Sequence, residues 1–194
     1  MRILIACEYS GIVREAFRAK GHDAISCDLL PADDNSQHHY TGDVLDILHD
    51  SWDMVIAFPP CTDLAVSGAA WFAQKRADGR QQASIDFFSL FPGIAPKWCI
   101  ENPIGIMSTR YRKPDQIIHP WQYGHPEQKS TCLWLGGLPK LVETDNVKEQ
   151  MMLLPKNKRE RLHYLPPSKD RWKLRSTTYT GVAQAMAEQW SELL

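Results

Sequence analysis

Two side chains with chemical potential stand at the ends of apolar runs. Cys61 closes the stretch FPPC, and Glu101 opens the stretch ENP forty residues later. A thiolate is a good nucleophile, and a carboxylic acid beside a reacting group donates a proton. Proline fixes its own backbone angle and restricts the residue before it, so FPPC gives the thiol a stiff support. Cys61 and Glu101 are therefore the first candidates for catalytic residues.

Each candidate also has an ordinary structural explanation. A lone cysteine is usually a small core residue, and an aspartate after a strand, such as Asp43, is usually a turn or a helix cap. A glutamate before Asn-Pro is usually the end of a strand. The order and spacing of these residues along the chain therefore matter more than any one of them.

Apolar runs alternate with amphipathic stretches over the first half of the chain. The pattern predicts strands at 2–6, 22–28, 54–58 and 97–103, and helices at 12–21, 44–50 and 80–91. Residues 29–43 are a polar, turn-rich connection, and 130–139 is a further strand candidate. The last stretch is amphipathic, with apolar residues at helical spacing: Val182, Met186, Trp190 and Leu193. We expect an α/β fold, with a doubly wound, mostly parallel, Rossmann-like sheet.

The predicted strand ends gather the candidate residues at one edge. In doubly wound sheets, ligands bind outside the carboxyl ends of the strands. The first strand runs into the turn at 7–11, the second ends at Asp28, the third leads to Cys61 and the fourth ends at Glu101. The sequence thus predicts one site at this edge.

Composition restricts the class of protein. The chain has 194 residues, of which 43% are hydrophobic and 23% charged, so one compact domain covering 1–194 is expected to fold without disulfides or metal. No apolar run approaches the ~20 residues that span a bilayer. The five cysteines are odd in number and lack CxxC spacing, which indicates reduced thiols in a cytoplasmic protein.

Charge is concentrated in one segment, although the formal net charge is only −1. Between 148 and 175 there are nine Lys or Arg and only three Asp or Glu. Such a run is either a solvated surface loop or a patch that faces phosphates. We also expect 62–72 to form a lid with a hinge at Ser67-Gly68, and Lys75, Arg76 and Arg80 to be available for phosphate.

The ordered motifs resemble those of the cytosine carbon-5 methyltransferases. The FPPC stretch, the Glu101-Asn102 pair and the Gly42-Asp43 pair occur in that family's order, as do CEYSG near the amino terminus, YGHPEQKST at 123–131 and TYTGVAQAMA at 178–187. The resemblance implies a class I S-adenosyl-L-methionine-dependent methyltransferase fold. It also implies a short phage or bacterial type, in which the basic segment 140–176 replaces a full target-recognition domain.

The resemblance implies S-adenosyl-L-methionine as the cofactor. Asp28 takes the place of the acid that holds the cofactor ribose, and Leu29 that of the residue against the adenine. Cys7 stands where the family usually has an aromatic residue. The cofactor-binding residues implied in this way are Cys7, Glu8, Tyr9, Ser10, Gly11, Asp28, Leu29, Asp43, Phe58 and Pro60.

The family chemistry explains the stiff support of the thiol. Carbon 5 of cytosine is a poor nucleophile, so a thiolate first adds to carbon 6, and carbon 5 of the resulting enamine then accepts the methyl group. The resemblance gives Cys61 the role of this nucleophile. It gives Glu101 the role of the acid at ring nitrogen 3, where charge develops.

The implied partner is DNA, either single-stranded or easily opened, because the target base must leave the stack. Lys129 and Thr131 replace the two arginines that follow the family's Tyr-Gly-x-Pro turn. The nucleic-acid-binding candidates are Lys129, Thr131, Lys158, Arg159 and Arg161. No metal site is expected, because the histidines lack a completing set of ligands. Two alternatives stay open: the same chemistry on a free cytidine nucleotide, and a catalytically silent module that binds cofactor or nucleic acid.

Overall fold

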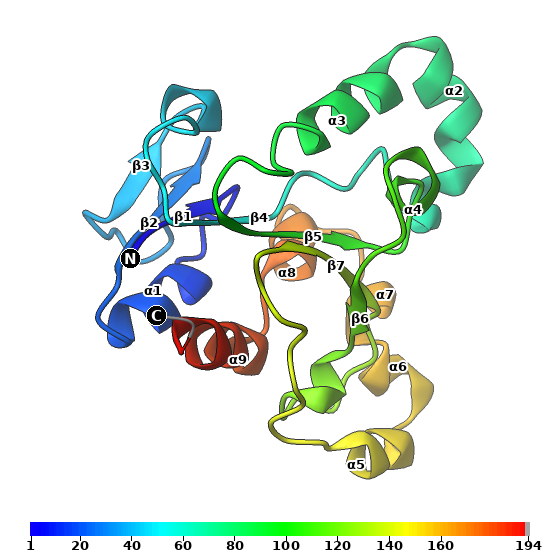
Figure 1. Cartoon of the computed structure of the whole chain (residues 1–194). Helices are drawn as coiled ribbons and strands as arrows, with labels where there is room; N and C mark the ends of the chain where they lie inside the picture. Colours follow the sequence, from blue (N-terminus) through cyan, green and yellow to red (C-terminus); the bar gives the residue numbers. More distant parts are fainter. Residues whose placement is uncertain (193–194) are drawn as a thin grey trace.

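The chain forms a seven-stranded sheet at its centre (Figure 1). The computed structural model describes residues 1–192, so the contact expected of Leu193 lies outside the described residues. The strand order is β3-β2-β1-β4-β5-β7-β6, with β5–β7 and β7–β6 antiparallel and the other pairs parallel. The strands are β1 (Arg2–Ala6), β2 (Asp23–Asp28), β3 (His39–Thr41), β4 (Met54–Ala57), β5 (Lys97–Pro103), β6 (Gln116–Ile118) and β7 (Thr131–Gly136).

Helices cover both faces of the sheet. On one face, α1 (Ile12–Ala19) and α9 (Thr180–Ser191) lie side by side (Figure 1) and bury Phe17, Met186 and Trp190. On the other face, α3 (Arg80–Phe88) packs through Phe88 against the edge of the Trp134 ring. The remaining helices are short: α2 (Phe72–Ala77), α4 (Met107–Arg110), α5 (Lys148–Leu153), α6 (Lys156–Arg159), α7 (Arg161–Tyr164) and α8 (Arg171–Ser176).

The predicted α/β, doubly wound fold is confirmed, and the strand order with an antiparallel β7 fits the Rossmann-like class I arrangement. The central strands β1 and β4 are almost wholly buried. This burial explains why their sequences are continuous apolar runs rather than alternating ones.

Two local predictions were wrong. The stretch 44–50 forms only the 3-10 turn η1 (Val44–Asp46), and the connection 29–43 contains β3. The basic segment contains the four short helices α5 to α8, for which no helix was predicted. Strands and helices this short carry too few side chains to show a period in the sequence.

The segment after Cys61 is helical as well. It forms the 3-10 helix η2 (Val66–Trp71) and then α2. Lys75 was expected to be available for phosphate, but it is buried, donates to the carbonyl of Thr62 and pairs with Asp63 at 3.1 Å. Arg80 is also engaged, because it pairs with Asp78. The expectation of a free phosphate-binding group was therefore wrong for Lys75, whereas the Arg80 side chain is 53% exposed and its role stays a prediction.

No helix within residues 1–192 has the length and apolar character needed to cross a membrane.

Candidate active site at the carboxyl edge of the sheet

The strand register brings the predicted residues to one edge. Ala6 of β1 is paired with Cys27 of β2 and with Ala57 of β4, and Ala57 is paired with Ile100 of β5. These four residues form a straight row across the sheet. One step further along each strand stand the candidates Asp28, Cys7, Phe58 and Glu101.

Cys61 is held in a fixed turn beyond β4. The Phe58 amide donates to the Ala6 carbonyl at 2.9 Å, which continues the β1–β4 pairing into the two prolines. The Cys61 carbonyl accepts from the amides of Leu64 at 3.0 Å and Ala65 at 2.9 Å. The buried Asn102 side chain donates to the Pro59 carbonyl at 2.8 Å. The stiff support predicted from the two prolines is thus tied at both ends.

The electrostatic surroundings of the Cys61 thiol are mixed. Burial raises its pKa, and the Glu101 carboxylate raises it further, while the Lys129 and Arg175 cations lower it. The thiol is therefore mostly protonated at neutral pH, and the two cations are the groups that stabilise its thiolate form.

Glu101 is suited to act as an acid. Burial raises the pKa of its carboxyl group, and Lys129 partly offsets that rise. Within residues 1–192, no hydrogen bond engages this carboxyl group, and it lines a small cavity. A carboxyl group in such a position is free to donate a hydrogen bond to a ligand.

The cavity lies between the sheet edge and the start of α9. The space that the centre of a water molecule can reach in it is about 20 Å³, which is room for one or two waters. Its walls come from the residue after β4, from β5, β6 and β7, and from α8, α9 and the segment between them, including Phe58, Glu101, Lys129, Thr131, Ser176 and Tyr179. Ser176 and Glu101 thus line the same small space.

The turn at 123–131 connects this cavity to α9. The His125 ring accepts a hydrogen bond from the Gly181 amide at 3.0 Å, at the start of α9. Glu127 accepts from the Tyr179 hydroxyl at 2.8 Å. Lys129 lines the cavity, and its ammonium group donates to the Arg175 carbonyl at 3.3 Å. Thr131 is buried in β7, opposite Pro103 and Ile118.

The turn after β1 is sharp and has two residues with positive φ. Gly11 adopts the left-handed conformation before α1, and a Cβ there would lie 2.3 Å from the Arg14 side chain. Cys7 also has a positive φ, of 59°. Glu8 is buried, and its carboxylate accepts from the Val13 and Arg14 amides. Glu8 therefore fixes the turn by capping α1.

A short helix covers this turn. The ring of the buried Tyr9 lies 5.7 Å from that of Trp172 on α8, and its hydroxyl donates to the Lys173 carbonyl at 3.1 Å. The Ser10 hydroxyl is close to Glu8, at 3.2 Å. Lys173 in turn pairs with Asp33, in the loop after β2, at 3.1 Å. Thus α8 connects the turn at 7–11 to the loop at 29–38.

The residues after β2 present both polar and apolar surface. Burial raises the pKa of Asp28, and one carboxylate oxygen accepts from the Leu30 amide at 3.0 Å. Leu29 is 77% exposed. Asp43 caps η1 through the Leu45 amide. Asp28 and Leu29 thus place an acid and an exposed apolar side chain next to the turn at 7–11.

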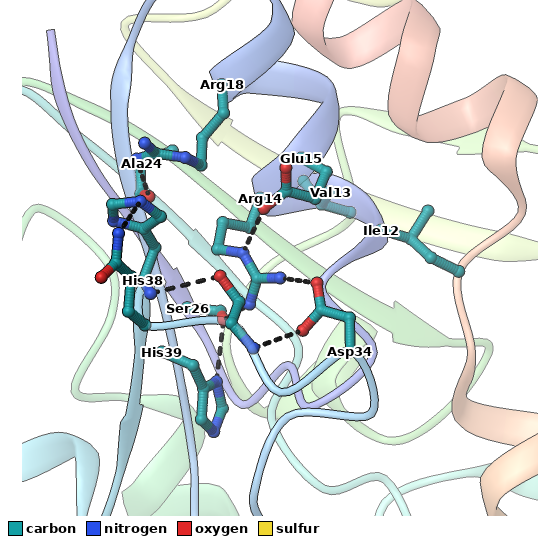
Figure 2. Close-up of polar contacts among 12 residues, drawn as sticks. Ile12, Val13, Arg14, Glu15, Arg18, Ala24, Ser26, Asp34, His38 and His39 are labelled. Carbon is teal, nitrogen blue, oxygen red and sulfur yellow. Dashed lines mark hydrogen bonds and ion pairs between the residues drawn. The ribbon is translucent and has the colours of Figure 1, made fainter.

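A polar network supports the loop at 29–38 (Figure 2). Arg14 is fully buried on α1 and donates to the Ser26 hydroxyl at 2.7 Å and to the Asp34 carboxylate. Ser26 also contacts His39, whose other ring nitrogen is 2.8 Å from the Leu30 carbonyl. The network therefore runs from α1 to the turn that carries Asp28. No sequence pattern predicted this network, because an arginine in a short amphipathic helix usually faces solvent.

The predicted nucleic-acid-binding residues are only partly together. Lys129 and Thr131 line the cavity. The Arg159 carbonyl accepts from the Gln128 amide, and Arg161 pairs with Glu127 at 2.9 Å, so both lie beside the irregular segment leading to Lys129. Lys158 is exposed on α6. Arg175, which lowers the thiol pKa of Cys61, was not among the predicted site residues.

Among residues 1–192, no group of three or more His, Cys, Asp or Glu side chains is arranged to hold a metal ion.

Comparisons with known proteins give matches in structure only. No protein-family model and no curated protein sequence matches the chain. Solved structures that are similar include a candidate DNA modification methyltransferase encoded within an E. coli prophage, at 18% identity and a TM-score of 0.48. The S. pombe Dnmt2 methyltransferase is similar at 15% identity and the same TM-score. The matches cover 80% and 88% of this chain but only 56% and 61% of those proteins.

Proposed function

We propose that this chain is an S-adenosyl-L-methionine-dependent methyltransferase that methylates carbon 5 of cytosine in DNA through a covalent adduct at Cys61. The proposal includes a short phage or bacterial type, in which the basic segment 140–176 replaces a target-recognition domain. One observation supports it most strongly. Cys61 lies on a fixed turn after β4, and Glu101 lies near the end of the adjacent β5, close enough for its charge to raise the pKa of the Cys61 thiol.

In this mechanism Cys61 is the nucleophile. Its thiolate adds to carbon 6 of cytosine, and the S–C6 bond breaks again when the proton on carbon 5 leaves. Burial raises the thiol pKa, and the cations Lys129 and Arg175 offset part of this rise because they stabilise the thiolate. The fixed turn keeps the sulfur in one place and so reduces the entropy lost on attack.

Glu101 serves the other side of the base. Addition of sulfur puts negative charge on the ring, and the charge is neutralised when ring nitrogen 3 receives a proton or a hydrogen bond. Burial raises the pKa of Glu101, which favours the protonated form that can donate to ring nitrogen 3. Lys129, which lines the same cavity, adds positive charge there.

The bound cofactor supplies an electrophilic sulfonium methyl group. The residues that fit it are those of the turn at 7–11 together with Asp28, Leu29 and Asp43. The positive φ values of Cys7 and Gly11 turn the chain sharply at the end of β1. Asp28 has a second carboxylate oxygen for a ribose hydroxyl, and Leu29 offers an apolar surface for adenine.

Labelled methyl transfer tests the proposal. The protein and methyl-labelled cofactor are incubated in three separate reactions, with single-stranded DNA, with duplex DNA or with cytidine nucleotides. Nucleosides are then identified by mass spectrometry. We expect labelled 5-methylcytosine in DNA, more in the single strand than in the duplex, and none with Cys61→Ala. Label on another base or another ring position would refute the proposal.

A free cytidine nucleotide is the second candidate substrate. The observation that favours it is that part of the basic segment is already engaged within the chain: Arg161 pairs with Glu127, and Lys173 pairs with Asp33. Fewer cations are then left for a polymer of phosphates. Labelled nucleotide together with unlabelled DNA would identify this substrate.

A further inference from the structure

The loops that follow the two proposed catalytic residues are joined by their backbones. The Val66 amide donates to the Ile104 carbonyl at 3.0 Å, and the Ile106 amide donates to the Leu64 carbonyl at 3.0 Å. Between them, Ala65 and Gly105 form an antiparallel bridge. We call residues 64–66 and 104–106 together the loop clamp.

Gly105 makes this contact possible. A Cβ at this position would lie 2.3 Å from the Leu64 carbonyl oxygen and 3.2 Å from the Ala65 Cα. Both are backbone atoms, so no side-chain rotation relieves the clash. The φ of Gly105 is not in the left-handed region. Close approach of the two loops, and not an unusual backbone angle, is therefore what requires glycine here.

The clamp is directly connected to both catalytic candidates. On one side, the Leu64 and Ala65 amides donate to the Cys61 carbonyl, so the clamp begins one turn after the thiol. On the other side, Ile104 is three residues after Glu101 in the same strand and turn. A shift of the clamp therefore changes the separation of the thiol from the acid.

We propose that Gly105 is a positioning residue that fixes Cys61 relative to Glu101 through the loop clamp. This inference rests on the proposed function and deepens it. The clamp makes the thiol and the acid one preformed unit. Gly105 touches neither substrate nor cofactor, so its effect falls on kcat rather than on cofactor affinity.

Two variants disturb the clamp in independent ways. Gly105→Ala introduces the clashing Cβ. Val66→Pro removes the amide that donates to Ile104 and little else, because Val66 is the first residue of η2 and is 54% exposed. Proline is well tolerated at that position, and Ala65, at φ −72° and ψ 139°, already has the conformation that precedes proline.

Each variant has a matched control. Val66→Ala removes the same side chain but keeps the amide. Gly21→Ala places a methyl group at a positive-φ glycine just after α1, far in sequence from the clamp, where a Cβ meets nothing within 4 Å. It therefore reproduces a loss of stability from backbone strain without touching the clamp.

Methyl transfer and amide hydrogen exchange are measured for all four variants. We expect Gly105→Ala and Val66→Pro to lower kcat by about tenfold or more, with KM for the cofactor within about threefold of wild type. We also expect the Ile106 amide to exchange about tenfold or more faster in both. The two controls should keep kcat within about twofold of wild type.

The outcomes separate this inference from the proposed function. If the wild type transfers no methyl group, the proposed function fails, yet exchange of the Ile106 amide still tests the clamp. Unchanged exchange in Gly105→Ala and Val66→Pro overturns the clamp. Wild-type kcat in both variants, or an equal loss in Val66→Ala, overturns the positioning role of Gly105.

Discussion

Removal of the buried Arg14 guanidinium is expected to loosen the whole adenosine side of the proposed cofactor site. Arg14 is fully buried, and its network leads through Ser26 to His39 (Figure 2). The other ring nitrogen of His39 contacts the Leu30 carbonyl, two residues after Asp28. Arg14→Met keeps most of the apolar stem and removes the donors. The loop at 29–38 then loses its contact from Asp34 to α1.

The expected loss of stability follows from how exposed the partners are. Breaking a buried ion pair costs about 3–5 kcal/mol when a charge stays buried and unpaired. Here the Glu15 and Asp34 side chains are 53% and 39% exposed, so water solvates them after the change. The buried Ser26 hydroxyl keeps His39 as a partner at 2.8 Å. The free energy lost is therefore that of one charged hydrogen bond and two screened ion pairs, about 2–3 kcal/mol in all.

Urea unfolding measures this free energy, and calorimetry measures cofactor affinity. A loss of 2–3 kcal/mol corresponds to a fall in Tm of about 5–10 °C for a domain of this size. We expect cofactor binding to weaken several-fold. Arg18→Met, one turn later on α1, is the control, because within residues 1–192 the Arg18 side chain donates a single hydrogen bond, to the Ala24 carbonyl at 3.2 Å. Equal unfolding free energies for the two variants would refute the role given to the network.

Three further predictions concern the site itself. Lys129→Met is expected to raise the thiol pKa of Cys61, because a cation that favours the thiolate is lost. Glu101→Gln is expected to lower the same pKa, because a repelling carboxylate is lost. The pH dependence of iodoacetamide alkylation measures both shifts, and shifts of the opposite sign would contradict the arrangement. Asp28→Ala is expected to weaken cofactor binding by about 1–3 kcal/mol through a lost polar contact, and unchanged calorimetric affinity would show that the ribose lies elsewhere. Alanine at three basic side chains of the 140–176 segment is expected to weaken DNA binding almost equally for unrelated sequences and to lower the salt slope by up to about three phosphate equivalents; normal binding at every salt concentration would exclude a phosphate role for Lys158, Arg159 and Arg161.

The sequence predicted the parts of the site that lie at strand ends. Apolar runs mark β1, β2 and β5, and the carboxyl ends of parallel strands meet at one edge, so Cys7, Asp28 and Glu101 could be placed together from the sequence. The stiff turn before Cys61 was equally predictable, because proline restricts the backbone locally.

The remaining features depend on contacts between distant parts of the chain. Arg175 comes near Cys61 only because α8 folds back over Tyr9, and nothing in the local sequence encodes that return. Lys75 was misplaced because the sequence does not show that Asp63 and the Thr62 carbonyl receive its charge. The closeness that requires Gly105 arises where two loops meet, forty residues apart, and only a structure reveals it.

Trapping of a covalent adduct tests the central claim most directly. The protein is incubated with the cofactor and with single-stranded DNA in which cytosine carries fluorine at carbon 5, so that the adduct cannot eliminate. Intact-mass and peptide mass spectrometry then locate the bond. We expect a stable adduct through Cys61 that carries the transferred methyl group, and none in Cys61→Ala. An adduct at any other residue, or methyl transfer to ordinary cytosine by the Cys61→Ala variant, would contradict the account.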